Sequence, residues 1–538
     1  MLTRTSNTLF YGDNLDILRA SVADESVDLV YLDPPFNSSA TYNVLFKSPA
    51  GEQSQSQIEA FDDTWHWTAR GAEQAFDEVI HSGNSDAAEM LRAMRSFLKE
   101  NDMMAYLAMM AVRLLELHRV LKPTGSLYLH CDPTASHYLK VLLDSIFGPV
   151  HFRNEIIWKR SNPKSLGSIN FPNCTDTILR FSKSAKAIFH QPYEVHDPNY
   201  VESAYRYSDE NGTYRLLPLL NPNDNRPNLT YEFLGVTRVW RWTKERMQEA
   251  HKEGLVVQLK PGAVPQYKKY LADSKGRTVT NCWTDIQQAA GNEALGYPTQ
   301  KPLALLERII SASSNEGDLV LDPFCGCGTT VHAAQKLNRR WIGIDITHLA
   351  IGLVKRRLID AFPLAQFEIH GVPKDIGAAR ELAKADPHQF QLWVLSMIEA
   401  QPYKGGKKGA DTGIDGFLYF KPDGKGTEKA IVEVKGGENV SPQWVRALGQ
   451  VVERERAKIG VLVTLTDPTT TMRREASAAG FYDPGGDQRW RDTRFERIQI
   501  LTVEDLFDGK RPHMPWVDPS VFRKAKRENT EKQGELEM

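Results

Sequence analysis

Four consecutive residues near the amino terminus could hold a nucleobase for chemistry on its amino group. The apolar run 27–32 predicts a buried strand, and Asp33, Pro34, Pro35 and Phe36 follow it directly. Two consecutive prolines restrict the backbone and remove two N–H donors, so a carboxylate and its neighbouring carbonyl groups face outward beside an aromatic ring. This set suits an exocyclic amino group, with the ring stacked on the base. A plain Pro-Pro turn at a strand end is the alternative.

Residues 319–345 have the pattern of a nucleotide-binding turn. The apolar residues 319–321 predict a strand, a Cys-Gly-Cys-Gly turn follows, and a helical pattern leads to a second strand that ends in an acid. Glycines let a ligand approach the backbone, and the terminal acid can accept hydrogen bonds from ribose hydroxyls. A structural β-turn is the alternative. The residues expected to bind a nucleoside cofactor here are Asp322, Pro323, Phe324, Gly326, Gly328, Thr329, Thr330 and Asp345.

Three residues near the carboxyl terminus could support metal-dependent hydrolysis. Asp415 precedes a predicted strand, and Glu433 and Lys435 lie two positions apart on the next one, which places both on one face. The two carboxylates, Asp415 and Glu433, can bind Mg²⁺ beside the lysine and activate water against a phosphodiester. A solvated hairpin with alternating charges is the alternative. Glu399 is a further candidate ligand on the preceding helix, with a surface charge as the favoured interpretation.

The composition of the 538 residues is typical of a globular chain with more than one domain. Hydrophobic residues make up 41% and charged residues 25%, and the net charge is −2. A nucleic-acid enzyme with this charge must cluster its basic groups. No apolar run approaches membrane-spanning length, and no secretory signal pattern opens the chain. Five scattered cysteines without a CxxC pair favour neither disulfides nor a zinc site, so we expect a cytoplasmic protein.

The elements that must position these residues alternate between strands and helices, which predicts an α/β fold. Strands are expected at 125–132 and 152–159, and one long helix is expected at 91–121. The polar residues 37–86 are expected to form a mobile loop beside the catalytic strand. His130, near the end of a predicted strand, belongs either to an active-site wall or to structural hydrogen bonding.

Three motifs in a characteristic order resemble the amino-group DNA methyltransferases of the β class. The motifs are DPPF at 33–36, PTQKPLALLERII at 298–310 and LDPFCGCGTT at 321–330. The resemblance covers roughly residues 8–363 and implies a Rossmann-like domain that binds S-adenosylmethionine and methylates DNA. It also implies that Asp13 contacts the adenine of the cofactor and that the segment of Lys301 lines its methionine end. An N-cap role is the alternative for Asp13.

The same resemblance implies how a methyl group would be transferred. Asp33 and the Pro34 carbonyl would hold the amino group of a flipped base, Phe36 would stack on it, and the nitrogen would attack the methyl group directly. Residues 190–292, with interleaved aromatic and basic side chains, would be an inserted target-recognition region. An aspartate at the first motif position favours adenine N6. Cytosine N4 and an RNA substrate stay open as alternatives.

The residues around Asp415 and the Glu433–Lys435 triplet, with the helix and the apolar strand that follow, resemble the PD-(D/E)xK nucleases, in particular Mrr-type restriction endonucleases. The resemblance implies a Mg²⁺-dependent endonuclease fused to the methyltransferase in a restriction–modification protein. A C-terminal domain that only binds DNA or a partner is the alternative. Double-stranded DNA is the expected partner, no membrane is expected, and a homodimer stays open.

The expected organisation has six parts. They are the catalytic half of a methyltransferase (1–189), the target-recognition insertion (190–292), the S-adenosylmethionine-binding half (293–365), a linker (366–385), an α/β restriction-endonuclease-like domain (386–522) and a disordered tail (523–538).

Overall fold

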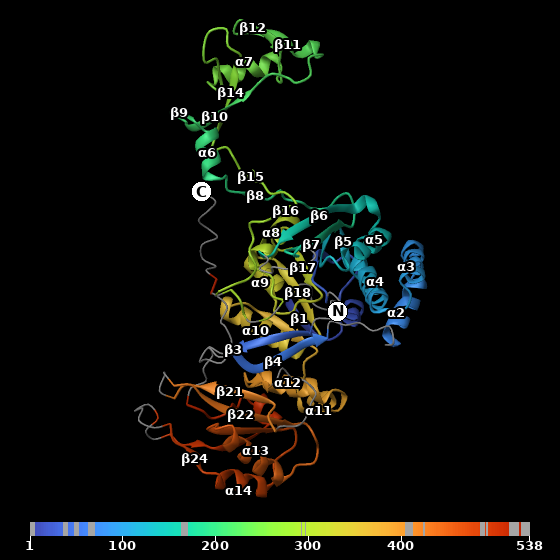
Figure 1. Ribbon diagram of the computed structural model, residues 1–538, viewed down its shortest axis with the longest axis vertical. Helices are drawn as coiled ribbons and strands as arrows, with labels where there is room; N and C mark the ends of the chain where they lie inside the picture. The colour runs from blue at the N-terminus through green and yellow to red at the C-terminus, as the bar shows by residue number, and fades with distance from the viewer. Residues whose placement is uncertain are drawn as a thin grey trace. The chain divides into compact units, whose positions relative to one another are not determined.

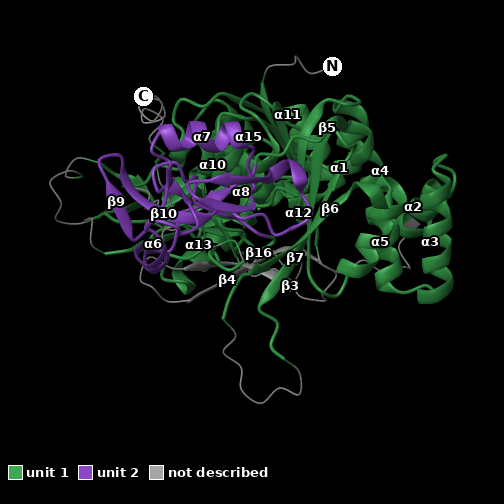
Figure 2. Cartoon of the chain, turned by 90° about the horizontal axis from the view of Figure 1, so that it is seen from above, with its two compact units in different colours: residues 1–190, 281–538 green, residues 191–280 purple. Residues whose placement is uncertain are grey.

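The chain forms two compact units (Figure 2), residues 191–280 and residues 1–190 with 281–538. The computed structural model describes most of both units. For residues 41–47, 53–62 and 70, it describes the backbone alone. The described residues are 6–35, 41–47, 53–62, 70–162, 171–291, 293–295, 297, 299–403, 413–422, 426–484, 490, 493–515 and 527–528.

The larger unit contains a nine-stranded sheet (Figure 1). In order across the sheet, the strands are β16 (Cys282–Trp283), β6 (Phe152–Lys159), β7 (Thr175–Ser182), β5 (Leu121–Cys131), β2 (Val27–Leu32), β17 (Leu319–Asp322), β18 (Arg340–Asp345), β1 (Asn7–Tyr11) and β19 (Phe367–His370). The six strands from β5 to β19 pair in parallel, and β7 pairs antiparallel with both of its neighbours. Every residue of β2 is buried, as expected for a strand covered on both faces.

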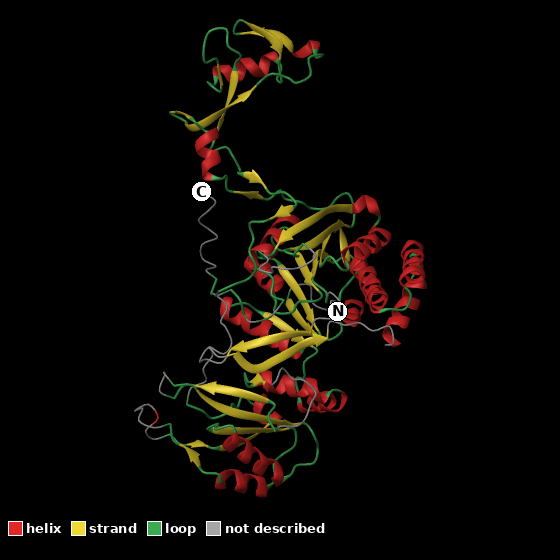
Figure 3. Ribbon diagram, viewed as in Figure 1, coloured by secondary structure: helices red, strands yellow, loops and turns green. Residues whose placement is uncertain are grey.

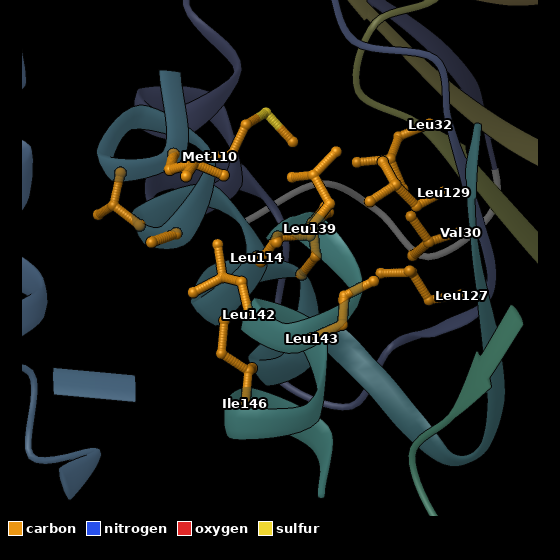
Figure 4. Packing of buried hydrophobic residues seen from close by; sticks show 14 of the residues in the cluster. Val30, Leu32, Met110, Leu114, Leu127, Leu129, Leu139, Leu142, Leu143 and Ile146 are labelled. Carbon is orange, nitrogen blue, oxygen red and sulfur yellow. The ribbon is translucent and has the colours of Figure 1, made fainter. Parts of the chain in front are cut away.

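Helices cover this sheet and complete its core. They are α1 (Asn14–Ser21), α2 (Arg70–Ile80), α3 (Ser85–Leu98), α4 (Asp102–Val120), α5 (Ser136–Phe147), α8 (Leu303–Ser313), α9 (Thr329–Lys336) and α10 (His348–Ala361). Figure 4 shows how α4 and α5 pack on the sheet. Leu114 of α4 and Leu139 of α5 face the strands that carry Val30 (β2) and Leu127 (β5). These four side chains are fully buried, and the apolar area that they remove from water stabilises the position of the central strands.

The expectations of a loop at 37–86 and of one helix at 91–121 are wrong. The first segment contains a hairpin, β3 (Thr41–Lys47) with β4 (Gln53–Asp62), and the helix α2. The second is interrupted between α3 and α4, because Lys99 has a left-handed backbone (φ 63°) and Asn101 caps the new helix by accepting from the Met104 N–H at 2.9 Å.

The smaller unit has its own apolar core around the fully buried Trp240. Its elements are β8 (Tyr193–Glu194), α6 (Pro198–Ala204), β9 (Tyr207–Asp209), β10 (Gly212–Pro218), β11 (Thr230–Phe233), β12 (Val236–Val239), α7 (Lys244–Lys252), β13 (Val256–Val257), β14 (Gln266–Tyr270) and β15 (Arg277–Thr278). This unit is shorter than the expected insertion 190–292, because Cys282 and Trp283 already pair with β6 of the nine-stranded sheet.

A five-stranded sheet organises the C-terminal part of the larger unit (Figure 3). Its strands are β20 (Gln401–Pro402), β21 (Gly416–Phe420), β22 (Glu428–Lys435), β23 (Ile459–Thr464) and β26 (Ile498–Thr502), and β24 (Phe481–Tyr482) pairs with β25 (Phe495–Glu496). The helices are α11 (Ile376–Ala385), α12 (Pro387–Met397), α13 (Pro442–Arg454), α14 (Thr470–Ala478) and α15 (Val503–Phe507). None of the described helices is long and apolar enough to cross a membrane.

The expected linker 366–385 is folded instead. Its first part is β19, which pairs with β1, and its second part is α11, which contributes Ala379 and Ala383 to the core of the C-terminal sheet. In the expected tail, Glu528 is one of two described residues, and its carboxylate contacts His332 and Lys336 of α9. The expectation of disorder otherwise concerns residues outside the described set.

Candidate active site

A cavity of about 280 Å³ lies at the carboxyl ends of β1, β2, β17 and β18. Ligand sites gather at this edge of a parallel sheet, because the turns that follow neighbouring strands meet there. The residues around the cavity are Gly12, Asp13, Asn14, Tyr31, Asp33, Pro35, Arg113, Tyr297, Thr299, Gln300, Lys301, Leu306, Asp322, Pro323, Phe324, Cys325, Gly326, Cys327, Thr329, Thr330, Asp345, Ile346 and Thr347. The motifs at 33–36 and 321–330 thus share one cavity.

Asp33 stands on the wall of this cavity, directly after β2. One carboxylate oxygen, Oδ2, forms an ion pair with Lys301. The other oxygen, Oδ1, is buried and has no hydrogen-bond partner among the described residues. Pro34 is buried and Pro35 lines the cavity. The fourth residue of the motif, Phe36, lies outside the described residues.

The glycine turn between β17 and α9 requires residues without side chains. Gly328 has φ 74°, and a Cβ atom there would come within 2.8 Å of Cγ2 of Val354. Gly326 has φ 48° and lies against the ring of Tyr297, 3.3 Å from where its own Cβ would be. Gly328 is also the N-cap residue of α9. Gly326 thus lines the cavity, whereas Gly328 lies outside the cavity wall and allows the close packing of the turn on Val354.

Asp345 ties the second strand to this turn. Its Oδ2 accepts from the Gly326 N–H at 2.9 Å, and its Oδ1 accepts from the N–H and the hydroxyl of Thr347, both at 2.9 Å. Burial raises the pKa of Asp345 to about 6, although these hydrogen bonds lower it. The carboxylate of Asp345 therefore already accepts three hydrogen bonds from the protein.

Asp322 is the second buried acid of the cavity. It accepts from the Phe324 N–H at 3.0 Å and from the hydroxyl of Thr330. Burial is the main reason why its pKa is raised to about 7, and the negative charges of Asp33 and Asp345 raise it further. Four carboxylates line this cavity with two cations, Lys301 and Arg113, so it favours a ligand that carries positive charge.

Asp13 is held at the other end of the cavity. Both of its oxygens lie 3.0 Å from Nη2 of Arg113, and Oδ1 also accepts from the Leu15 N–H at 2.8 Å. The N-cap role that the sequence left open is therefore confirmed, since Asp13 caps α1. Arg113 in turn donates to Oδ1 of Asn14 at 2.6 Å, and Asn14 donates to the Pro323 carbonyl at 2.9 Å.

In the C-terminal part, Asp415 is hydrogen-bonded to the backbone on both sides of Glu433, since its own N–H donates to the Val432 carbonyl at 2.9 Å. The Val434 N–H donates to Oδ2 of Asp415 at 2.6 Å, and Nζ of Lys435 lies 2.7 Å from Oε1 of Glu433. Two carboxylates on neighbouring strands beside a lysine provide the oxygen donors that Mg²⁺ prefers. Among the described residues, no three His, Cys, Asp or Glu side chains form a metal-binding group. Glu399 pairs instead with Arg356, as the surface-charge interpretation expected.

Comparison with known proteins agrees with this geometry. The family model of the N6/N4 DNA methylases matches residues 27–356, which contain all of the described cavity wall except Gly12, Asp13 and Asn14. The chain belongs to the DNA methylase family. A model of restriction endonucleases, of the Mrr type, matches residues 382–481, which contain Asp415, Glu433 and Lys435.

Curated relatives of the DNA methylase include type II methyltransferases and a subunit of a type III restriction–modification enzyme. The type II methyltransferase M.EcaI of Enterobacter cloacae is 29% identical over 71% of this chain and 76% of its own length. The Mod subunit of the type III enzyme StyLTI of Salmonella typhimurium is 28% identical over 62% and 51%, respectively. The type II methyltransferase M.KpnI of Klebsiella pneumoniae is 25% identical over 63% and 78%. The protein is a DNA methyltransferase of the restriction–modification type with a restriction-endonuclease domain.

Several cavity residues of the DNA methylase escaped the sequence analysis, among them Tyr31, Arg113 and Tyr297. Arg113 had a usable signal, because it is a charged residue within the apolar helix 102–120 and such a residue needs a buried partner. Gln300 closes the loop before α8, where its side chain accepts from the Leu295 N–H and donates to the Glu293 carbonyl, both at 2.7 Å. No local pattern distinguished the two tyrosines.

Proposed function

We propose that the DNA methylase transfers a methyl group from S-adenosylmethionine to the N6 amino group of adenine at a specific site in double-stranded DNA. The supporting observation is the buried Oδ1 of Asp33, which has no hydrogen-bond partner among the described residues. An unpaired buried acceptor destabilises a fold unless a ligand supplies the donor. An exocyclic amino group is a donor of this kind.

The residues of the cavity fit S-adenosylmethionine. Asp345 would accept from the ribose hydroxyls, Asp13 would contact the adenine, and the segment of Lys301 would line the methionine end. The remaining predicted contacts would come from Asp322, Pro323, Phe324, Gly326, Gly328, Thr329 and Thr330. Two raised carboxyl pKa values, those of Asp322 and Asp345, support a ligand with positive charge, since such a ligand stabilises the ionised acids. The bound cofactor supplies an electrophilic methyl group.

Asp33 and the Pro34 carbonyl would accept hydrogen bonds from the amino group of the flipped base, which aims its lone pair at the methyl group. Alignment of the two reactants is then the main catalytic contribution, and no covalent intermediate with the protein is needed. Asp33 would also take the proton that the nitrogen loses. Phe36 would stack on the base.

Adenine is the proposed base because the motif begins with aspartate, as in the adenine-N6 enzymes that it resembles. Cytosine N4 is the second candidate, since its amino group presents the same two donors to Asp33 and Pro34. The unit 191–280 would read the target sequence. Its strands β10 and β14 carry both basic and aromatic side chains, for example Arg215 opposite Lys269. Basic side chains suit contacts with phosphates, and the mixture suits contacts with bases, which supports this role.

The C-terminal domain would cut DNA with the help of Mg²⁺. Asp415 and Glu433 would hold the ion, and Lys435 would stabilise the attacking water or the developing charge. The pairing of Lys435 with Glu433 supports a shared role on one face of β22. The alternative, a domain that binds DNA without cutting it, predicts no dependence on these three residues.

One experiment tests both activities. Unmethylated DNA is incubated with labelled S-adenosylmethionine, with and without Mg²⁺, and the products are examined by nucleoside mass spectrometry and on a gel. N6-methyladenine and Mg²⁺-dependent fragments are expected. N4-methylcytosine would replace the proposed base by the second candidate, and intact DNA in every lane would contradict the nuclease proposal. A parallel assay with matched RNA would contradict the DNA substrate if RNA were methylated preferentially.

A further inference from the structure

A line of buried polar side chains lies beside the catalytic strand. The hydroxyl of Tyr31 on β2 lies 2.9 Å from Nδ1 of His130 on β5, and Nε2 of His130 lies 3.1 Å from Oδ2 of Asp176 on β7. Nε of Arg160 lies 3.2 Å from the other oxygen of Asp176. Tyr31, His130 and Asp176 are 2%, 0% and 4% exposed, so the line runs through the protein interior.

One proton position in this line follows from its last member, Asp176. Burial raises the pKa of Asp176, but the hydrogen bond and charge of His130 and the charge of Arg160 outweigh it, so the pKa is lowered and the acid is ionised. A carboxylate only accepts, so Nε2 of His130 carries a proton. Nδ1 of the same ring shares a hydrogen bond with the Tyr31 hydroxyl, so His130 joins Tyr31 to Asp176 in a fixed orientation.

The end of β2 has a particular need for anchors. Its ladder with β17 covers only Leu29 and Val30, and its ladder with β5 ends at Leu32. Pro34 and Pro35 have no N–H group, so hydrogen bonds from these two residues cannot hold the backbone just after the acid. Asp33 must therefore be placed largely by side chains. Lys301 is one such anchor, because it pairs with the carboxylate itself.

We propose that the chain of Tyr31, His130 and Asp176 is a second anchor, which positions Asp33 for methyl transfer. Tyr31 precedes Asp33 by two residues, so both side chains leave the strand on the same face, and both line the cavity. Fixing the phenol between the cavity and His130 fixes the strand end that carries the acid. The inference rests on the proposed role of Asp33 as acceptor of the target amino group.

The neighbouring strand offers a matched control for Tyr31. Tyr128 lies directly opposite Tyr31 in the register of β2 and β5, is equally buried, and its hydroxyl makes a 2.7 Å hydrogen bond with Ser313. Tyr128 is not among the described residues around the cavity. Substitution of either tyrosine by phenylalanine removes one buried hydroxyl, so the two variants have comparable structural consequences.

The test compares Tyr31→Phe, Tyr128→Phe and Asp33→Ala in the full-length protein. Methyl-transfer kinetics, the dissociation constant for S-adenosylmethionine and the thermal unfolding midpoint are measured for each. Tyr31→Phe should lower kcat about tenfold or more, because a small misplacement of a reacting group is costly, with the cofactor dissociation constant unchanged. Tyr128→Phe should leave kcat within about twofold of the original value. Its unfolding midpoint should shift by about as much as that of Tyr31→Phe.

The outcomes separate the two proposals. Equal kcat values for Tyr31→Phe and Tyr128→Phe, with Asp33→Ala inactive, would overturn the positioning role alone. Full activity of Asp33→Ala would overturn the proposed function on which it rests. A second pair of variants covers the case in which Tyr31→Phe does not fold. Asp176→Asn keeps an acceptor for His130 and should retain more activity than Asp176→Ala, and equal activities would contradict the inference.

Discussion

Two acids of the methyltransferase cavity and the two acids of the C-terminal domain are held in place in opposite ways. In the methyltransferase cavity, Asp33 pairs with a lysine 268 positions later in the chain, and Asp13 pairs with an arginine 100 positions later. In the C-terminal domain, Asp415 accepts from a backbone N–H only 19 positions away, and Glu433 pairs with the lysine two positions beyond it. Asp33 and Asp13 thus depend on side chains from distant parts of the chain, whereas Asp415 and Glu433 depend on a single strand pair.

This difference predicts how each site responds to change. A site held by strand register keeps its geometry when one side chain is lost, because the backbone ladder of β21 and β22 is unaffected. A site held by distant side chains loses its geometry with any one of them. The two sites also belong to separate cores, so a substitution in one should leave the other intact.

The largest expected effect is a reciprocal loss of the two activities. Asp33→Ala should lower methyl transfer about a thousandfold and leave Mg²⁺-dependent cleavage at the level of the unmodified protein, and Glu433→Ala should do the reverse. Both rates can be measured on one DNA substrate, by methyl incorporation and by gel. Loss of both activities in either variant would show that the sites are coupled and would contradict their independence.

A smaller effect is expected from the anchor of the catalytic acid. Lys301→Met should lower kcat for methyl transfer about tenfold to a hundredfold, because Asp33 loses the partner that fixes one of its oxygens. Lys336→Met is the control, since Lys336 pairs with Glu307 away from the cavity wall. Equal kinetics for the two variants would mean that the ion pair between Lys301 and Asp33 is dispensable.

The affinity for S-adenosylmethionine should depend on pH. The free cavity holds Asp322 and Asp345 with pKa values of about 7 and about 6, and a positively charged ligand favours their ionised forms. Affinity is therefore greatest above the higher pKa and falls as pH falls through both values, by up to about tenfold per unit for each group. Calorimetric titration across this range measures the effect. Asp322→Asn should remove the upper step, and an unchanged profile would contradict its assignment.

The smallest effect is expected at Glu399. Its side chain is 53% exposed and pairs with Arg356 on the surface, so Glu399→Ala should change the free energy of unfolding by less than about 1 kcal/mol. Cleavage should stay at its original rate, in contrast to Glu433→Ala. A variant that folds but no longer cuts would place Glu399 in the metal site and would show that the C-terminal site is less local than the comparison states.

The features that the sequence predicted correctly are local, and one that it missed depends on a distant part of the chain. The strand before Asp33, the glycine turn and the alternation of Glu433 with Lys435 are local patterns, and each was predicted from a few consecutive residues. The folded state of 366–385 was missed, because β19 gains its partner only from the first strand of the chain. The hairpin at 41–62 was missed because its second strand begins with a polar Gln-Ser repeat and lacks the apolar alternation that indicates a strand.

The sequence by itself therefore determined which groups are available for chemistry: an acid before two prolines, a glycine turn closed by a second acid, and two carboxylates beside a lysine. Only the tertiary structure decided what surrounds them. It placed Lys301 on Asp33, Arg113 on Asp13 and the line from Tyr31 to Asp176 behind the catalytic strand. The physical reason is that backbone periodicity acts over a few residues, whereas the pairing of buried polar groups is settled by which strands and helices pack side by side.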